Sequence, residues 1–135
     1  MKILRIEHVG IAVESIEKDA PFWKHILGIQ HLGTESVKGQ GVTTDIYNTE
    51  HGKIELLEAL GVDSPMVKFL KKRGPGMHHI CLEVENIFEA IRELKDNSIE
   101  TITDEPSVGA EGMLVIFIHP NSTGGVLVEL SQKPK

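Results

Sequence analysis

Two histidines and two glutamates hold related positions in the two halves of this chain. His8 lies in the segment IEHVGIAVESI and His79 in MHHICLEVENI, and a shift of 71 residues lays the first segment on the second. Each half then ends in a similar apolar segment, KIELLEAL with Glu55 and VLVELSQ with Glu129. Imidazole and carboxylate groups are common protein ligands of Zn²⁺, Ni²⁺, Co²⁺, Mn²⁺ and Fe²⁺. The four residues therefore predict one divalent metal site with open positions for water or substrate.

Strand alternation separates the two adjacent histidines. Successive side chains of a strand point to opposite faces, so only one of His78 and His79 shares the face that corresponds to His8. The repeat matches His79 with His8 and puts His78 on the aliphatic face, with Ile80 and Leu82. We expect His79 to be the ligand and His78 to be structural.

The two glutamates lie between apolar neighbours on strands that should be buried. A buried carboxylate without a partner is costly, so Glu55 and Glu129 require a cation, a metal or a raised pKa. Taken alone, each of the four residues is more typical of an ordinary structural residue of a strand than of a metal ligand. Their common placement in the repeat favours the metal site.

The spacing of apolar residues predicts the elements that position these side chains. Each His segment alternates apolar and other residues as a strand does, and helical spacing follows it. The helix is expected to end near Gly28 in the first half and near Asn97 in the second, and three strand-like pieces come after each helix. The fold class is α+β, with the order strand, helix and three strands (βαβββ) twice in one domain, 1–135. Module one spans about 4–60, a linker with a short helix about 61–76, and module two about 77–132.

Composition excludes several classes of protein. With 135 residues the chain is long enough for one domain, and its 14 basic and 20 acidic residues give a net charge of −6, which argues against a nucleic-acid partner. No apolar run has the roughly 18 residues of a membrane span, and the start MKILRIEHVG lacks the core of a signal peptide, so we predict a cytoplasmic protein without membrane contact. The single cysteine, Cys81, is typical of a small packing residue.

The remaining histidines indicate no second site. For His25, on a helix face, and for His31 and His51, at strand ends or turns, we predict no function. His119 precedes Pro120 and either caps a turn or touches a substrate.

Three pieces of the sequence resemble the vicinal oxygen chelate (glyoxalase/bleomycin resistance) superfamily and, within it, the methylmalonyl-CoA epimerase family. They are EHVGIAV, IELLEALGVDSPMVKFLKKRGPGMHHICLEVENI and DEPSVGAEGMLVIFIHPNSTGGVLVEL, and together they cover most of the chain. HP followed by GVLVEL is the more specific part. The resemblance implies a curved mixed sheet around a metal cleft, a homodimer, and metal ligation by His8, Glu55, His79 and Glu129.

The resemblance also implies an activity. It is metal-dependent epimerisation at C2 of methylmalonyl-CoA, an acyl-CoA thioester, by proton abstraction through a metal-stabilised enolate. Glu129 resembles the ligand that doubles as an acid/base. Several epimerases have a second glutamate where this chain has Thr44, and Asp45 follows one position later. Because a shift of one residue reverses the face of a strand, Asp45 is the second catalytic acid/base only if a bulge or loop realigns it.

Two other functions remain open at this point. Lactoylglutathione lyase (glyoxalase I) uses the same pattern of two histidines and two glutamates, and some members of the superfamily only bind small molecules. The basic run KFLKKR (68–73) is able to contact the anionic CoA, but it is also typical of a helix end that complements its own dipole.

Overall fold

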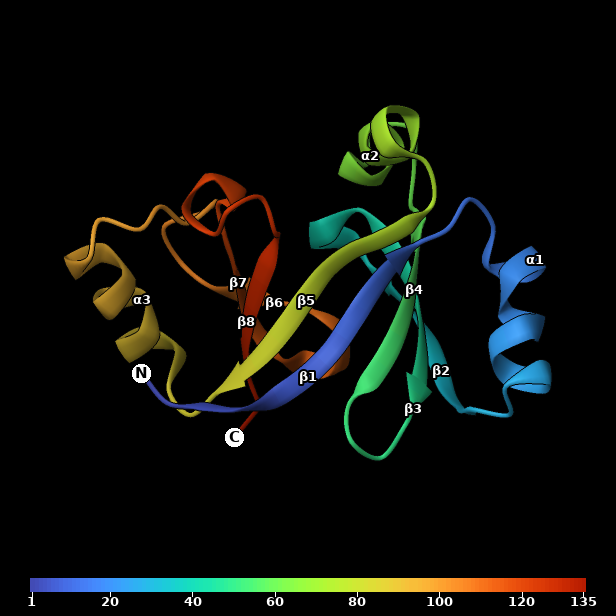
Figure 1. Cartoon of the computed structure of the whole chain (residues 1–135), viewed down its shortest axis with the longest axis horizontal. Helices are drawn as coiled ribbons and strands as arrows, with labels where there is room; N and C mark the ends of the chain where they lie inside the picture. Colours follow the sequence, from blue (N-terminus) through green and yellow to red (C-terminus); the bar gives the residue numbers. More distant parts are fainter. The chain divides into compact units, whose positions relative to one another are not determined.

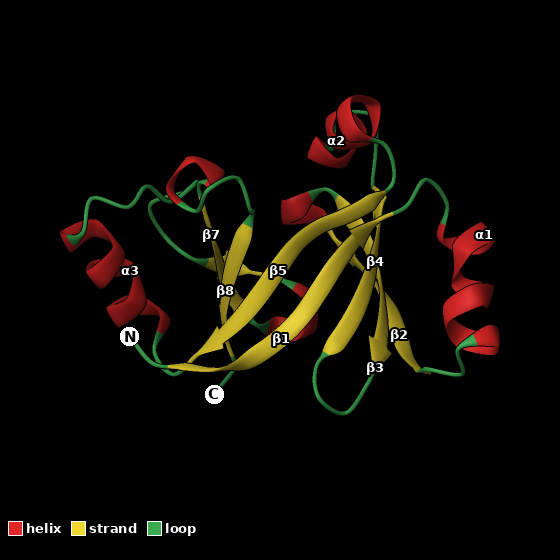
Figure 2. Cartoon of the chain, in the orientation of Figure 1, coloured by secondary structure: helices red, strands yellow, loops and turns green.

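The computed structural model describes residues 1–135, and the chain order of its elements is βαβββ twice (Figures 1 and 2). The first series is β1 (Ile3–Ala12), α1 (Ile16–Pro21), a π-helical turn η1 (Phe22–Ile26), β2 (Gln30–Val37), η2 (Lys38–Gln40), β3 (Val42–Asn48) and β4 (Lys53–Ala59). The linker helix α2 is Pro65–Arg73. The second series is β5 (Gly76–Val84), α3 (Ile87–Asp96), β6 (Ser107–Val108), η3 (Ala110–Gly112), β7 (Leu114–Ile118), η4 (Pro120–Ser122) and β8 (Val128–Gln132). The predicted α+β class with two βαβββ modules is confirmed.

The chain forms two compact units that do not coincide with the two modules. One unit contains 8–78, and the other contains 79–135 together with the first seven residues, 1–7. The strand β1 is therefore divided: its residues up to Glu7 belong to the unit that contains 79–135, and its residues from His8 belong to the unit 8–78. The predicted limits of the modules follow the sequence repeat and stay a prediction.

The unit 8–78 builds its core on one face of the strands β2-β3-β4-β1. β1 and β4 are parallel, and β3 is antiparallel to both β2 and β4. The helix α1 begins at Ser15, whose side chain accepts a hydrogen bond from the Lys18 N–H, as an N-cap should. The core joins the strands to α1 and η1 and comprises Ile11, Val13, Ile16, Trp23, Ile29, Ile54, Tyr47 and Leu56.

The other unit repeats this design with the strands β5-β8-β7-β6. Asn86 caps α3 by accepting hydrogen bonds from the N–H groups of Phe88 and Glu89. The apolar side of α3 packs on one face of the strands, and in Figure 1 the helix lies along one side of β7 and β8. Its core comprises Leu82, Val84, Ile87, Ala90, Ile91, Leu94, Ile99, Leu114, Ile116, Ile118, Val128 and Leu130.

Both units thus bury an aliphatic strand face beneath a helix, which leaves the alternate residues on the opposite face. His8 and Glu55 lie on that opposite face in one unit, and His79 and Glu129 in the other. None of the helices is both long enough and apolar enough to cross a membrane.

Candidate metal site

His8 and Glu55 form a buried pair in the unit 8–78. The parallel register places Glu55 beside Gly10, two residues after His8, so the imidazole and the carboxylate share one face. Nδ1 of His8 lies 3.0 Å from Oε2 of Glu55. Only 4% of the Glu55 surface is exposed, so the imidazole is a necessary partner for its carboxylate.

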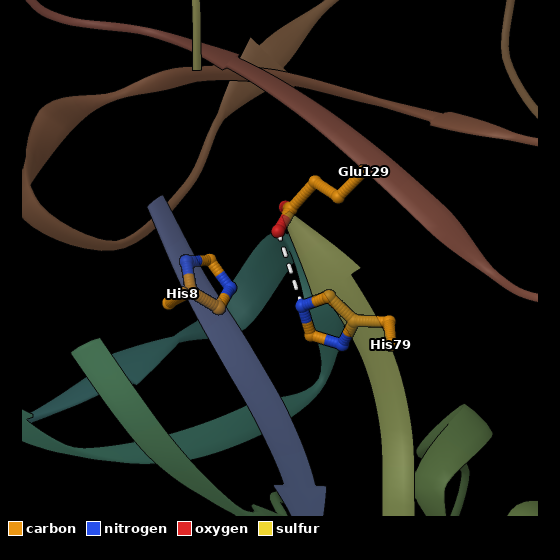
Figure 3. Close-up of side chains that lie close together, drawn as sticks. All are labelled: His8, His79 and Glu129. Carbon is orange, nitrogen blue, oxygen red and sulfur yellow. Dashed lines mark hydrogen bonds and ion pairs between the residues drawn. The ribbon is translucent and has the colours of Figure 1, made fainter. Parts of the chain in front are cut away.

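His79 and Glu129 form the equivalent pair in the other unit. Glu129 lies beside Cys81 in the parallel register, again two residues after the histidine. Nε2 of His79 lies 3.1 Å from Oε1 of Glu129, the contact drawn as a dashed line in Figure 3. Phe117, which opposes Glu129 across the β7–β8 ladder, places its ring edge-to-face with His79 at a centroid distance of 5.5 Å.

The two His–Glu pairs have the same arrangement on their strands. Gly10 and Cys81 are related by the same shift of 71 residues as the two histidines, so each glutamate occupies the same register in its unit. The pairs differ in the nitrogen that faces the carboxylate, Nδ1 in His8 and Nε2 in His79.

The donor atoms suit a divalent ion. Each pair supplies an imidazole nitrogen and a carboxylate oxygen, which are the donor types of zinc and related ions. Their separations of 3.0 and 3.1 Å are those of a hydrogen bond, which an ion held between the two atoms would replace. Ser131, on the same face as Glu129, is buried, and its hydroxyl has no hydrogen-bond partner. Because such a group normally has a partner, this face retains hydrogen-bonding capacity for a ligand.

His78 points to a different environment from its neighbour. It is half-buried and packs edge-to-face on Phe69 of α2 at a centroid distance of 4.7 Å. The sequence prediction of a structural role accords with this ring contact. His119 accepts a hydrogen bond from the Asn121 N–H at 3.2 Å and so caps η4, one of the two roles expected for it.

Asp45 lies on the face of β3 opposite to Glu55. In the uninterrupted β3–β4 register Asp45 opposes Leu56, whereas Ile46 opposes Glu55. The bulge nearby is between His31 and Gly33 of β2 and leaves β3 regular. The realignment on which a catalytic role for Asp45 depended is therefore absent from β3.

Asp45 is instead a buried carboxylate at the centre of a hydrogen-bonded cluster, which joins it to the buried Tyr47, the partly exposed His31 and the exposed Thr34. Its Oδ1 accepts from Thr34 Oγ1 at 2.7 Å and lies 2.6 Å from His31 Nε2, and its Oδ2 accepts from the Tyr47 hydroxyl. Burial alone raises the pKa of the Asp45 carboxyl, but the hydrogen bonds from Tyr47, Thr34 and His31 outweigh it and hold that pKa below its usual value. Burial and the bond to Asp45 raise the pKa of Tyr47.

A second pair of buried carboxylates, Glu7 and Glu83, was also not assigned from the sequence. Arg5 Nε donates to Glu83 Oε1 at 2.9 Å and its guanidinium lies 3.8 Å from Glu7. The hydrogen bond to Glu83 raises the pKa of Arg5, and this ion pair ties the first residues of β1 to β5. The available signal was the alternation of β5, which puts Glu83 on the same face as His79.

Comparison with known proteins identifies the class to which this fold and these pairs belong. The sequence profile of the Glyoxalase/Bleomycin resistance protein/Dioxygenase superfamily matches residues 7–117. The chain belongs to this superfamily.

Within the superfamily, the chain is similar in sequence to several epimerases. The chain is 47% identical over 129 residues to the mitochondrial methylmalonyl-CoA epimerase of Homo sapiens, covering 95% of this chain and 73% of that protein. It is 40% identical to the ethylmalonyl-CoA/methylmalonyl-CoA epimerase of Cereibacter sphaeroides, covering 95% and 97%.

Solved structures of methylmalonyl-CoA epimerases also resemble this chain. A variant of the Streptomyces coelicolor methylmalonyl-CoA epimerase in complex with 2-nitronate-propionyl-CoA superimposes with a TM-score of 0.92 at 29% identity, covering 99% of this chain and all (100%) of that one. A methylmalonyl-CoA epimerase in complex with methylmalonyl-CoA and NH4+ gives 0.91 at 30% identity, covering 98% and 96%.

Proposed function

We propose that this protein is a metal-dependent epimerase that acts at C2 of methylmalonyl-CoA. The observation that carries the proposal is the pair of His–Glu contacts in equivalent registers, in a chain 47% identical to a methylmalonyl-CoA epimerase. Relatives under that name bind methylmalonyl-CoA and a nitronate analogue of its acyl group, which supports an acyl-CoA thioester as the substrate.

In this proposal the two pairs join in one site, with His8, Glu55, His79 and Glu129 as ligands of a divalent ion. Two neutral imidazoles and two carboxylates neutralise the charge of such an ion and leave coordination positions free. The donor set is shared by Co, Zn, Ni, Mn and Fe, so it does not choose among them. When bound, the ion supplies positive charge beside the thioester oxygen, where negative charge develops as C2 loses its proton.

Glu129 is the group that removes a proton from C2 in this proposal. Its carboxylate is buried and lies 3.1 Å from the imidazole of His79, on the strand face opposite to the helix-covered core. Phe117 packs edge-to-face on His79 and places an apolar ring on this side of the pair. The enolate left after this step is then protonated on the opposite side of C2, which gives the other epimer.

We do not assign that second proton transfer to Asp45. Its carboxylate lies on the helix-covered face with Leu56 and already accepts hydrogen bonds from Thr34 and Tyr47. A carboxylate held in this way, with a lowered pKa, is a poor proton donor near neutral pH.

A homodimer is part of the proposal because of the resemblance. The first half of β1 exposes Ile3, Leu4 and Ile6, each more than two-fifths accessible, which is an apolar surface that a second subunit would cover. If sedimentation equilibrium gives the mass of a single chain, the homodimer is contradicted, whereas the proposed activity is not.

The test of the activity is exchange of the C2 proton of methylmalonyl-CoA in deuterated water. We expect exchange by the metal-loaded protein, none by the protein after treatment with a chelator, and restoration when a divalent ion is added back. Glu129→Gln, which keeps the side-chain shape, should lose exchange while the chain stays folded. Turnover of the hemithioacetal of methylglyoxal and glutathione, without exchange on methylmalonyl-CoA, would replace the proposal with a lyase.

A further inference from the structure

The helix α2 carries an unusual concentration of positive charge. Four of the fourteen basic residues of this acidic chain lie in its nine positions, and it contains no Asp or Glu, whereas α1 and α3 both contain acidic residues. The four residues are Lys68, Lys71, Lys72 and Arg73.

These cations are exposed and have no carboxylate partner. None of the four forms an ion pair within 4.0 Å, in contrast to Arg5 and Lys133, which face Glu83. Lys68, Lys71 and Lys72 have the spacing i, i+3 and i+4, so their ammonium groups lie on one face of the helix. Like charges at this spacing repel one another, and an anion bound between them relieves that repulsion.

The helix dipole does not account for this arrangement. The C-terminus of a helix has about half a negative charge, which falls off within the last turn, so one cation is enough to complement it. Here three cations occupy the last turn and a fourth extends the charged face toward the helix centre. The surplus positive charge is suited to a polyanion.

Aromatic contacts hold this basic face next to the strand that carries His79. The Arg73 guanidinium lies 6.0 Å from the centre of the Phe69 ring, and Phe69 in turn packs edge-to-face on His78. The helix ends at Gly74, and β5 begins at Gly76. His79 is six residues beyond Arg73, so the extended chain limits their separation to roughly 22 Å. An extended acyl-CoA is long enough to reach from one to the other.

We propose that the Lys68–Lys71–Lys72–Arg73 face of α2 binds the phosphate groups of the CoA nucleotide. This inference rests on the proposed function, since it concerns the same substrate. It separates the roles of the two regions: the His–Glu pairs act on the acyl group, and α2 provides affinity for the nucleotide at the far end of the thioester. Lysine and arginine give charge-assisted contacts to phosphate oxygens.

The test compares a substrate with the nucleotide to one without it. Lys71→Glu with Lys72→Glu is assayed by C2 deuterium exchange on methylmalonyl-CoA and on methylmalonyl-pantetheine, which lacks all the nucleotide phosphates. We expect the KM for methylmalonyl-CoA to rise at least about tenfold, because the two charge reversals remove two exposed contacts of up to about 1 kcal/mol each and add repulsion of the phosphates. The kcat and the KM for methylmalonyl-pantetheine should not change.

The matched control is Arg92→Glu with Lys95→Glu, which changes the same charge on exposed positions of α3. The control should leave the KM for methylmalonyl-CoA unchanged and so exclude an effect of net charge. In the wild type that KM should also rise with salt, and the α2 variant should lose this dependence.

The outcomes separate the two proposals. If the wild type exchanges neither thioester, the proposed function fails. If the wild type exchanges both but the α2 variant has an unchanged KM for methylmalonyl-CoA, or an equal rise for both thioesters or in the α3 control, the nucleotide site on α2 is wrong.

Discussion

Replacement of Asp45 by asparagine distinguishes a buried structural carboxylate from a catalytic one. The residue is 2% exposed, and its carboxylate contacts His31 at 2.6 Å, Thr34 at 2.7 Å and the Tyr47 hydroxyl. A hydrogen bond to a charged acceptor contributes roughly 1.5–3 kcal/mol and a neutral one about 1 kcal/mol, so three weakened bonds cost about 3 kcal/mol. The neutral amide is easier to bury, which offsets part of that loss and leaves a destabilisation of about 2 kcal/mol.

The assay is urea denaturation of the wild type and Asp45→Asn across pH. Because the folded pKa of Asp45 is lowered, its contribution is present above the unfolded pKa of about 3.9 and is lost as the pH falls through the folded value. The stability difference should therefore be full at pH 7 and shrink in acid, while the exposed control Asp63→Asn shows none. C2 exchange should survive in the folded variant. Unchanged stability together with lost exchange would refute the structural interpretation and restore Asp45 as a proton carrier.

Further predictions concern the ligand pairs and the core. His78→Ala should keep bound metal, because strand alternation puts His78 on the face opposite to His79 and its ring packs on Phe69 of α2, and loss of metal in that variant would contradict the assignment from strand alternation. Glu55→Gln should weaken metal binding but leave the chain folded, as measured by metal titration and circular dichroism, since glutamine keeps an oxygen ligand. Leu56→Ala, at a fully buried position of the 8–78 core, should lower the free energy of unfolding by roughly 2–5 kcal/mol, and a loss under 1 kcal/mol would show that this core is loosely packed.

Much of the fold was predictable because its signals are local and repeated. The alternation of IEHVGIAV and of MHHICLEV defines two strand faces, and the 71-residue shift shows that the two segments do the same task. The same alternation puts Glu55 and Glu129 on buried strands opposite the helices. The pairing of each glutamate with its histidine then requires only the parallel neighbour that a βαβββ module provides.

The contacts of Asp45 with His31 and Thr34 could not be predicted, because they depend on pairing between strands. A bulge in β2 between His31 and Gly33 is needed to bring both His31 and Thr34 to the same carboxylate, and nothing in the sequence marks it. Tyr47, two residues beyond Asp45, has the spacing of a same-face partner on a strand, which was a usable signal.

The division of β1 between the two units is likewise invisible to a repeat search. The repeat assigns all of β1 to module one, whereas the Arg5–Glu83 ion pair and the Glu85 N–H bond to the Lys2 carbonyl attach its first residues to the second unit. These are contacts between residues about eighty positions apart, which no local pattern reports.

The metal content of the purified chain tests the central claim most directly, because the claim is that two His–Glu pairs make one site. Elemental analysis should give one divalent ion per chain in the wild type, and loss of that ion in both His8→Ala and His79→Ala taken singly. Two ions per chain, or an ion retained when either histidine is replaced, would show that the pairs act separately and would contradict the single site.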